Sequence, residues 1–193
     1  MKKAVKLTLA IAMMMGATSL FAQKFGRIDM QALIYSMPET KDMQLKMEEF
    51  TKNLSDTYQT MEVEFNTKYQ EFIKNQATMT DAVRQMKEKE LNELASRRDE
   101  FIQMAQQDQQ KEQTRLYTPI YQKAQNAVDQ IAKAGGYTVI FQTGQQPYLD
   151  EAAVTDILAE VQTSLGIDPV AAAKALAEAA NTAGNGAETS AVN

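Results

Sequence analysis

The sequence predicts an α+β protein, mostly α, in which a long antiparallel helical hairpin projects as an arm from a small β-body. Three observations predict this fold class. Residues 27–134 contain no glycine, and Pro119 is the only proline between residues 39 and 134. The same stretch is rich in Gln, Glu, Lys, Met and Ala, which favour helix. Two short apolar segments, residues 25–30 and 137–141, flank it and predict strands.

The first 22 residues are typical of a secretory signal peptide. Three lysines and no acidic residue open the chain, and the apolar run over residues 7–15 is too short to span a bilayer. We expect cleavage after Ala22, which removes three lysines from a chain of net charge −5 and leaves −8 on residues 23–193. A membrane anchor or a buried N-terminal helix is the alternative. No later segment has transmembrane length, so we expect no stable membrane insertion.

The composition argues against catalysis. The chain has no histidine and no cysteine, so the commonest general base, the thiolate nucleophiles and the usual zinc ligands are missing. No glycine-rich phosphate loop precedes a helix, and the acidic charge does not suit nucleic-acid binding. We predict a protein that is not an enzyme, has no catalytic, cofactor-binding or metal residues, and binds no nucleic acid.

The outbound half of the arm is predicted to begin at Pro38, a residue that the first turn of a helix tolerates. Its apolar residues recur every three or four positions, at the period of a straight α-helix. About 38 such residues would form a helix roughly 57 Å long. The apolar positions are Met43, Met47, Phe50, Leu54, Tyr58, Met61, Phe65, Tyr69 and Phe72.

The arm, residues 38–134, should turn back at a tip near residues 75–81, where the apolar pattern lapses and Thr78 with Asp81 offers a capping box. The returning helix has an almost wholly polar stretch over residues 106–115. Because it would lie opposite residues 40–48, we expect loose packing there. Pro119 predicts either a kink or the start of a separate helix.

The β-body is predicted to be discontinuous, from residues 23–37 and 135–166. Beyond strand 137–141, we expect a second edge strand at 146–149 and a helix over 154–165. Residues 167–193 form an extension, with a short Ala-rich helix at 170–180 and a disordered tail at 181–193. So small a core favours oligomerisation. The candidate residues of the oligomerisation body are Phe25, Ile28, Met30, Tyr137, Val139, Ile140, Phe141, Ile157 and Val161.

The order of a signal, a strand, a helical hairpin and a returning strand resembles the Skp/OmpH-like family of periplasmic chaperones. The resemblance covers residues 23–166 and is specific at its two ends. The matching segments are residues 24–30, the short helix 31–36, Thr118-Pro119-Ile120, residues 136–140 and Val154-Thr155-Asp156-Ile157, which resembles the start of the last helix.

The resemblance implies a homotrimer in the periplasm, with a shared β-body and three arms around a cavity. Unfolded outer-membrane proteins would be held there without ATP and kept from aggregating. The best-known members are strongly basic, whereas this chain has a pI near 4.9. Lipopolysaccharide binding is therefore not expected to carry over, although residues 66–98 have a net charge of +2.

Residues near the tip are the candidate client contacts, because the seam between the helices is thinnest there. They are Tyr69, Phe72, Ile73, Met79, Val83 and Met86. Met43, Met47, Met61 and Phe65 are instead expected to fill the seam. The alternative functions are a passive coiled-coil envelope scaffold that binds no client, and an adaptor whose partner supplies the chemistry. The predicted strands argue against the scaffold, since a spacer needs no sheet.

Overall fold

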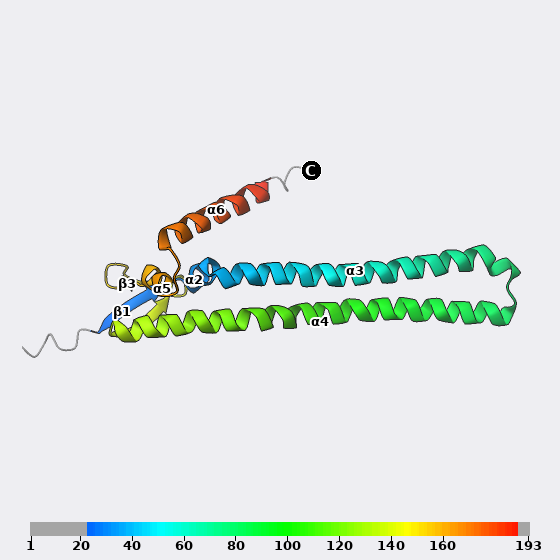
Figure 1. The fold of residues 1–193 in the computed structure, drawn as a ribbon, viewed down its shortest axis with the longest axis horizontal. Coiled ribbons are helices and arrows are strands. Elements are labelled where there is room, and N and C mark those ends of the chain that lie inside the picture. The colour runs from blue at the N-terminus through cyan, green and yellow to red at the C-terminus, as the bar shows by residue number, and fades with distance from the viewer. Residues whose placement is uncertain (1–22, 189–193) are drawn as a thin grey trace, which may run out of the picture. The chain divides into compact units, whose positions relative to one another are not determined.

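The computed structural model describes residues 23–188, so the predicted signal peptide lies outside the described residues. The first elements are β1 (Lys24–Ile28), α2 (Met30–Ser36), α3 (Pro38–Asn75), the 3-10 helix η1 (Gln76–Thr78) and α4 (Asp81–Ala134) (Figure 1). They are followed by β2 (Tyr137–Gln142), β3 (Thr155–Asp156), α5 (Leu158–Ser164) and α6 (Pro169–Glu188). The predicted fold class, mostly α with a small sheet, is confirmed.

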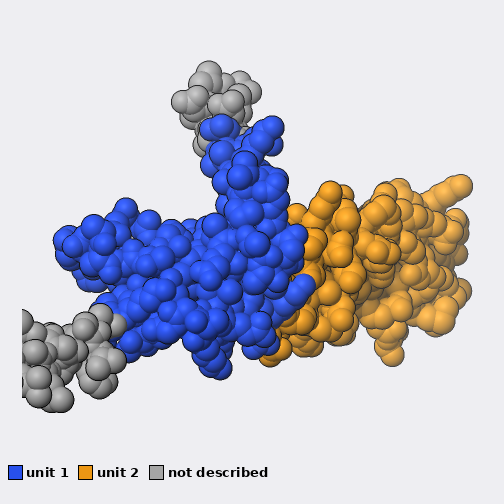
Figure 2. Space-filling model, turned by 60° about the vertical axis from the view of Figure 1, so that its left-hand side comes forward, with its two compact units in different colours: residues 1–36, 123–193 blue, residues 37–122 orange. Residues whose placement is uncertain are grey.

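The chain divides into two compact units, coloured separately in Figure 2. Unit 2 spans Met37–Gln122 and contains the helical hairpin. Unit 1 combines the residues before Met37 with those from Lys123 onward, and it contains the sheet. The last turns of α4 therefore belong to unit 1, whereas the sequence placed residues 123–134 in the arm.

The sheet of unit 1 has three parallel strands in the order β2-β1-β3. Phe25 lies opposite Val139, and Gly26 lies opposite both Ile140 and Thr155. The predicted edge strand at residues 146–149 is wrong, because this segment forms bends and coil around Pro147, which has no N–H to donate to a ladder. The third strand is β3, so the predicted helix start at residue 154 is also wrong. The α5 helix begins four residues later.

Tyr137 explains two glycines in unit 1. A Cβ on Gly26 would lie 2.6 Å from Ile140 Cδ1 and 3.1 Å from the Tyr137 ring, and a Cβ on Gly135 would lie 2.5 Å from that ring. Lys24 Nζ lies 4.0 Å from the ring centroid and donates to the Gly135 carbonyl at 3.1 Å. The ring is thus enclosed by backbone and by a cation, which only glycine's missing side chain permits.

The core of unit 1 is formed by β1, the short helices and the last turns of α4. The Gln162 amide is also buried and donates to Ser36 Oγ at 3.1 Å, which links α5 to α2. Gly166 follows the end of α5, with φ of +76° and two closing hydrogen bonds, from Gly166 N to Thr163 O and from Ile167 N to Gln162 O. The buried apolar residues are Ile28, Leu33, Ile34, Ala124, Ala127, Val128, Ile157, Val161 and Ala172.

The extension contains more helix than predicted. The α6 helix runs over Pro169–Glu188, so residues 181–188 of the predicted disordered tail are helical. Alanine, the strongest helix former, recurs throughout this segment and compensates for its two glycines. Residues 189–193 lie outside the described residues.

Helices α3 and α4 of unit 2 lie side by side and antiparallel (Figure 1). The turn between them covers residues 76–80, and Thr80 rather than Thr78 caps α4. Thr80 Oγ1 accepts from Val83 N at 3.4 Å, whereas Thr78 Oγ1 donates to the Asn75 carbonyl at 2.9 Å. Pro119 lies inside α4, so the alternative of a separate helix is wrong.

Candidate functional site

The seam between α3 and α4 buries few side chains. Between residues 41 and 115, which the structure describes throughout, Leu94 is the only buried apolar residue, at 6% exposure. The residues that were expected to fill the seam, including Met43, Met47, Met61 and Phe65, are half-buried. Apolar burial alone therefore holds α3 and α4 together only weakly, and polar contacts beside the seam add to the pairing of the two helices.

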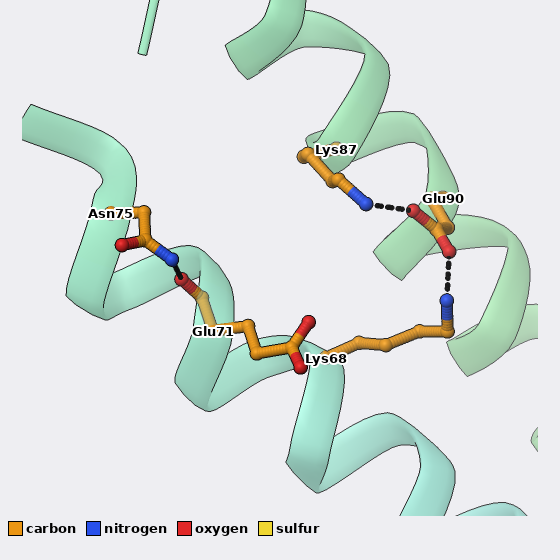
Figure 3. Close-up of polar contacts among 5 residues, drawn as sticks. All are labelled: Lys68, Glu71, Asn75, Lys87 and Glu90. Carbon is orange, nitrogen blue, oxygen red and sulfur yellow. Dashed lines mark hydrogen bonds and ion pairs between the residues drawn. The ribbon is translucent and has the colours of Figure 1, made fainter. Parts of the chain in front are cut away.

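A cluster of three charged residues joins the two helices in the outer part of the arm (Figure 3). Glu90 of α4 accepts from Lys68 of α3 and, at 2.9 Å, from Lys87 of its own helix. These two hydrogen bonds lower the pKa of Glu90 to about 2, and the bond from Lys68 has the larger effect. Glu90 in turn raises the pKa of Lys68. Glu90 therefore stays ionised over the whole physiological range of pH.

A second connection lies further along the same seam. Arg98 of α4 donates to Glu62 Oε1 of α3 at 2.6 Å, and Tyr58 donates to the same oxygen at 3.3 Å. The Arg98 guanidinium also lies 5.2 Å from the centroid of Phe65, whose ring stacks with Tyr69 at 6.0 Å. Ion pairs and aromatic contacts therefore join α3 to α4 at two places in the outer arm.

These contacts use most of the positive charge of residues 66–98. Of the seven cations in this stretch, five have a carboxylate oxygen within 4.0 Å. In the described part of the chain, Lys74 and Arg97 are the two cations of the stretch without an ion pair. Few cations of this stretch therefore lack a carboxylate partner, although its net charge stays at +2. The five paired cations are Lys68, Arg84, Lys87, Lys89 and Arg98.

The six predicted client-contact residues lie on both sides of the turn. Tyr69 and Ile73 on α3 are 43% and 47% exposed, and Val83 and Met86 on α4 are 39% and 61% exposed. Phe72 and Met79 are half-buried. The structure therefore places exposed apolar side chains on both helices near one end of the arm.

Sequence reasoning missed a second group of exposed apolar residues along the arm. Leu45 and Val63 fall outside the periodic apolar face of α3, so the sequence pattern could have predicted that they are exposed. Tyr117 and Tyr121 form a pair with ring centroids 6.1 Å apart. The exposed residues of this group are Leu45, Val63, Ile102, Met104, Tyr117 and Tyr121.

A groove opens between α3 and α4 where the polar stretch of α4 was expected to pack loosely. We name it the glutamine groove. It has a volume of about 480 Å³, and the expectation of loose packing is confirmed. Its lining consists of Met43, Gln44 and Met47 from α3 and of Gln106, Gln109, Gln110 and Gln113 from α4.

The predicted residues of the oligomerisation body fall into two groups. Ile28, Ile157 and Val161 are at most 2% exposed and belong to the core of unit 1 itself. The others keep accessible surface, and Val139 is 40% exposed. The half-buried members are Phe25, Met30, Tyr137, Ile140 and Phe141.

Two further properties of the described residues bear on function. No helix among them is both long enough and apolar enough to cross a membrane. No group of three or more acidic side chains among them is arranged to hold a metal ion. The surface features of the arm are thus apolar side chains, amides and ion pairs.

Comparison with known proteins gives matches over most of the chain. The family described as "Outer membrane protein (OmpH-like)" matches residues 24–165. A protein named "Chaperone protein Skp" from Yersinia enterocolitica is 29% identical over 161 residues, covering 82% of this chain and 93% of that protein. A protein of the same name from Pectobacterium atrosepticum is 26% identical over 143 residues, covering 72% and 84%.

A solved structure also shares the fold. It is described as a candidate outer membrane chaperone (OmpH-like) from Caulobacter crescentus, and it superposes with a TM-score of 0.66. The match covers 75% of this chain and 85% of that one, at 12% identity. The α6 helix lies beyond the residues that the family model matches.

Proposed function

Because the chain belongs to the OmpH-like family, we propose that it is an ATP-independent holding chaperone of the periplasm for unfolded outer-membrane proteins. Two relatives are named as Skp chaperones, and each spans most of this chain. The structural observation that carries the proposal is the set of exposed apolar residues near the arm tip, Tyr69, Ile73, Val83 and Met86. A spacer would have no need of them.

The physical role of such a surface follows from the client. An unfolded barrel protein in water exposes alternating apolar residues and unpaired strand edges, and both lead to aggregation. Exposed apolar side chains on a long helical hairpin can cover many such segments weakly, and flexible thioethers such as that of Met86 adapt to varied partners. No catalytic step and no cofactor is needed.

Each region of the chain has a part in this function. Residues 1–22 act as the signal peptide, and cleavage after Ala22 releases the chain into the periplasm. Unit 1 is the body through which three copies assemble, and the arms of the three copies surround the client. Binding to lipopolysaccharide is not proposed, because the exported chain is acidic and most cations of residues 66–98 are paired.

The test is light scattering of a urea-unfolded outer-membrane barrel protein that is diluted into buffer with or without the exported, processed chain. Suppressed aggregation that saturates near one client per three chains supports a trimeric holding chaperone. Unchanged aggregation at large excess of verified folded protein would overturn the proposal and favour the scaffold.

The tip residues have their own test. Replacing Phe72, Met79 and Met86 with Ser should weaken client holding by about tenfold, the effect of losing roughly 1.4 kcal/mol of contact energy, without dissociating the oligomer. A second variant, with Ser at Ile73, Val83 and Met86, changes exposed residues only and so guards against misfolding of the turn.

The matched control replaces three apolar arm residues away from the tip, Leu45, Val63 and Met104, which are 56%, 59% and 55% exposed. Sedimentation reports the oligomer, and light scattering reports the holding. Unchanged holding in both tip variants, or an equal loss in the control, would remove the tip from the proposal.

A further inference from the structure

The glutamine groove has no part in the tip site and differs in chemistry from the rest of the arm. No charged residue lines it, although charged residues flank the seam further out at Glu62, Lys68, Glu90 and Arg98. Its lining combines five side-chain amides with two thioethers. Because its lining is neutral, the groove offers its occupant no charged partner of its own.

The amides of the groove have unused hydrogen-bonding capacity. Each Gln side chain carries two N–H donors and one carbonyl acceptor. Within residues 23–188, none of the five makes a side-chain hydrogen bond to another protein group, and all five are exposed. They are therefore hydrated in the free protein, and a ligand that offers both donors and acceptors can replace that water.

The shape of the groove fits an extended main chain. Gln106 to Gln113 spans seven helical steps, about 10 Å of helix axis, which is the length of about three extended residues. The two thioethers, from Met43 and Met47, are half-buried on the opposite helix and can adapt to different side chains. Main-chain hydrogen bonds give affinity that does not depend on sequence.

We infer that the glutamine groove is a second client-contact site, which binds extended, unpaired main chain of an unfolded polypeptide through its side-chain amides. This inference rests on the proposed holding function and adds a mode of recognition to it. The tip contacts apolar side chains, and the groove contacts peptide groups, which every unfolded client exposes. Replacing a water molecule by a peptide group changes the free energy of each hydrogen bond only slightly. The contact is therefore short-lived and does not trap the client.

The test compares two short, fluorescein-labelled, uncharged peptides of alternating Ser and Leu. One has an ordinary main chain, and its twin is N-methylated at every second nitrogen, which removes half of the donors and leaves the side chains unchanged. Fluorescence anisotropy with the exported, processed chain should show the ordinary peptide binding about tenfold more tightly than the twin.

The variant that tests the groove replaces Gln106, Gln109 and Gln113 with Ala, a stronger helix former. This variant should bind the two peptides with about equal affinity. The matched control replaces three exposed glutamines that do not line the groove, Gln59, Gln103 and Gln107, and should retain the full ratio. Far-UV circular dichroism verifies that both variants are helical.

The outcomes separate the groove from the proposed function. Equal binding of the two peptides by the parent protein, no binding of either, or an unchanged ratio in the groove variant would each overturn the inference. If the barrel protein is still kept from aggregating in those cases, the holding function stands without the groove. If aggregation is not suppressed while the ratio depends on the groove glutamines, the main-chain site stands and the holding function falls.

Discussion

Two stretches of the same hairpin seam differ in how the two helices meet. In the outer stretch, Glu62, Lys68, Glu90 and Arg98 join the helices by hydrogen-bonded ion pairs beside the buried Leu94. In the glutamine groove, amides flank the seam, and the helices leave a hollow of about 480 Å³. The apolar period of α3 continues unchanged through both stretches. The residues of α4 therefore decide where the hairpin is closed and where it stays open.

The largest effect is expected from weakening the outer stretch, where ion pairs and Leu94 join the two helices. Replacing Leu94 with Ala should destabilise the arm by about 2–4 kcal/mol, because the side chain is 6% exposed and its removal leaves a cavity. Urea unfolding followed by far-UV circular dichroism measures the change. The control is Leu45→Ala on α3, which is 56% exposed and should cost no more than about 0.5 kcal/mol. Similar losses in the two variants would mean that Leu94 does not anchor the outer seam.

A smaller effect should come from closing the open stretch. Replacing Gln109 and Gln113 with Leu gives α4 apolar residues opposite Met43 and Met47, and should stabilise the arm by about 1 kcal/mol through partial burial. Hydrogen exchange should slow in residues 40–48 and 106–113. The same substitutions at Gln103 and Gln107, which do not line the groove, should leave exchange there unchanged. Faster or unaltered exchange in the groove variant would show that amides do not hold the groove open.

The sequence predicts the long elements of this fold well, because each depends on a local signal repeated many times. The start of α3 at Pro38 and the helix stop before Gly136 follow from single residues with strong backbone preferences. The open groove was also predictable, because ten consecutive residues of α4 are almost wholly polar. A helix that lacks apolar residues on its inner face cannot close a seam whatever its partner offers.

The short elements were harder to predict, because their partners lie far along the chain. Thr155 and Asp156 form β3 only because β1 lies beside them, more than 120 residues earlier in the sequence. The Arg27 guanidinium holds this region from β1, at 2.6 Å from Glu151 and 3.4 Å from Asp156. The ion pairs across the arm were equally hidden, since they need the register of the two helices, which the position of the turn sets.

The smallest expected effect concerns the charges of the closed stretch. Replacing Glu90 with Gln removes the carboxylate that Lys68 and Lys87 share, and should lower the thermal midpoint at neutral pH by less than Leu94→Ala does. The pKa of Glu90 is lowered from 4.5 to about 2 by these hydrogen bonds. A depressed pKa means that the contribution is complete above about pH 4.5 and is lost as the pH falls toward 2.

Thermal midpoints of the parent protein and Glu90→Gln should therefore differ at pH 7 and converge as the pH falls from 4.5 to 2. The control is Asp56→Asn, which breaks an exposed pair with Lys52 on one helix and should lower the midpoint at pH 7 by less than Glu90→Gln does. A difference that stays constant down to pH 2 would mean that Glu90 acts through packing rather than charge. Convergence would instead show that ion pairs across the seam help to close the outer arm, whereas the lining of the glutamine groove has no charged residue.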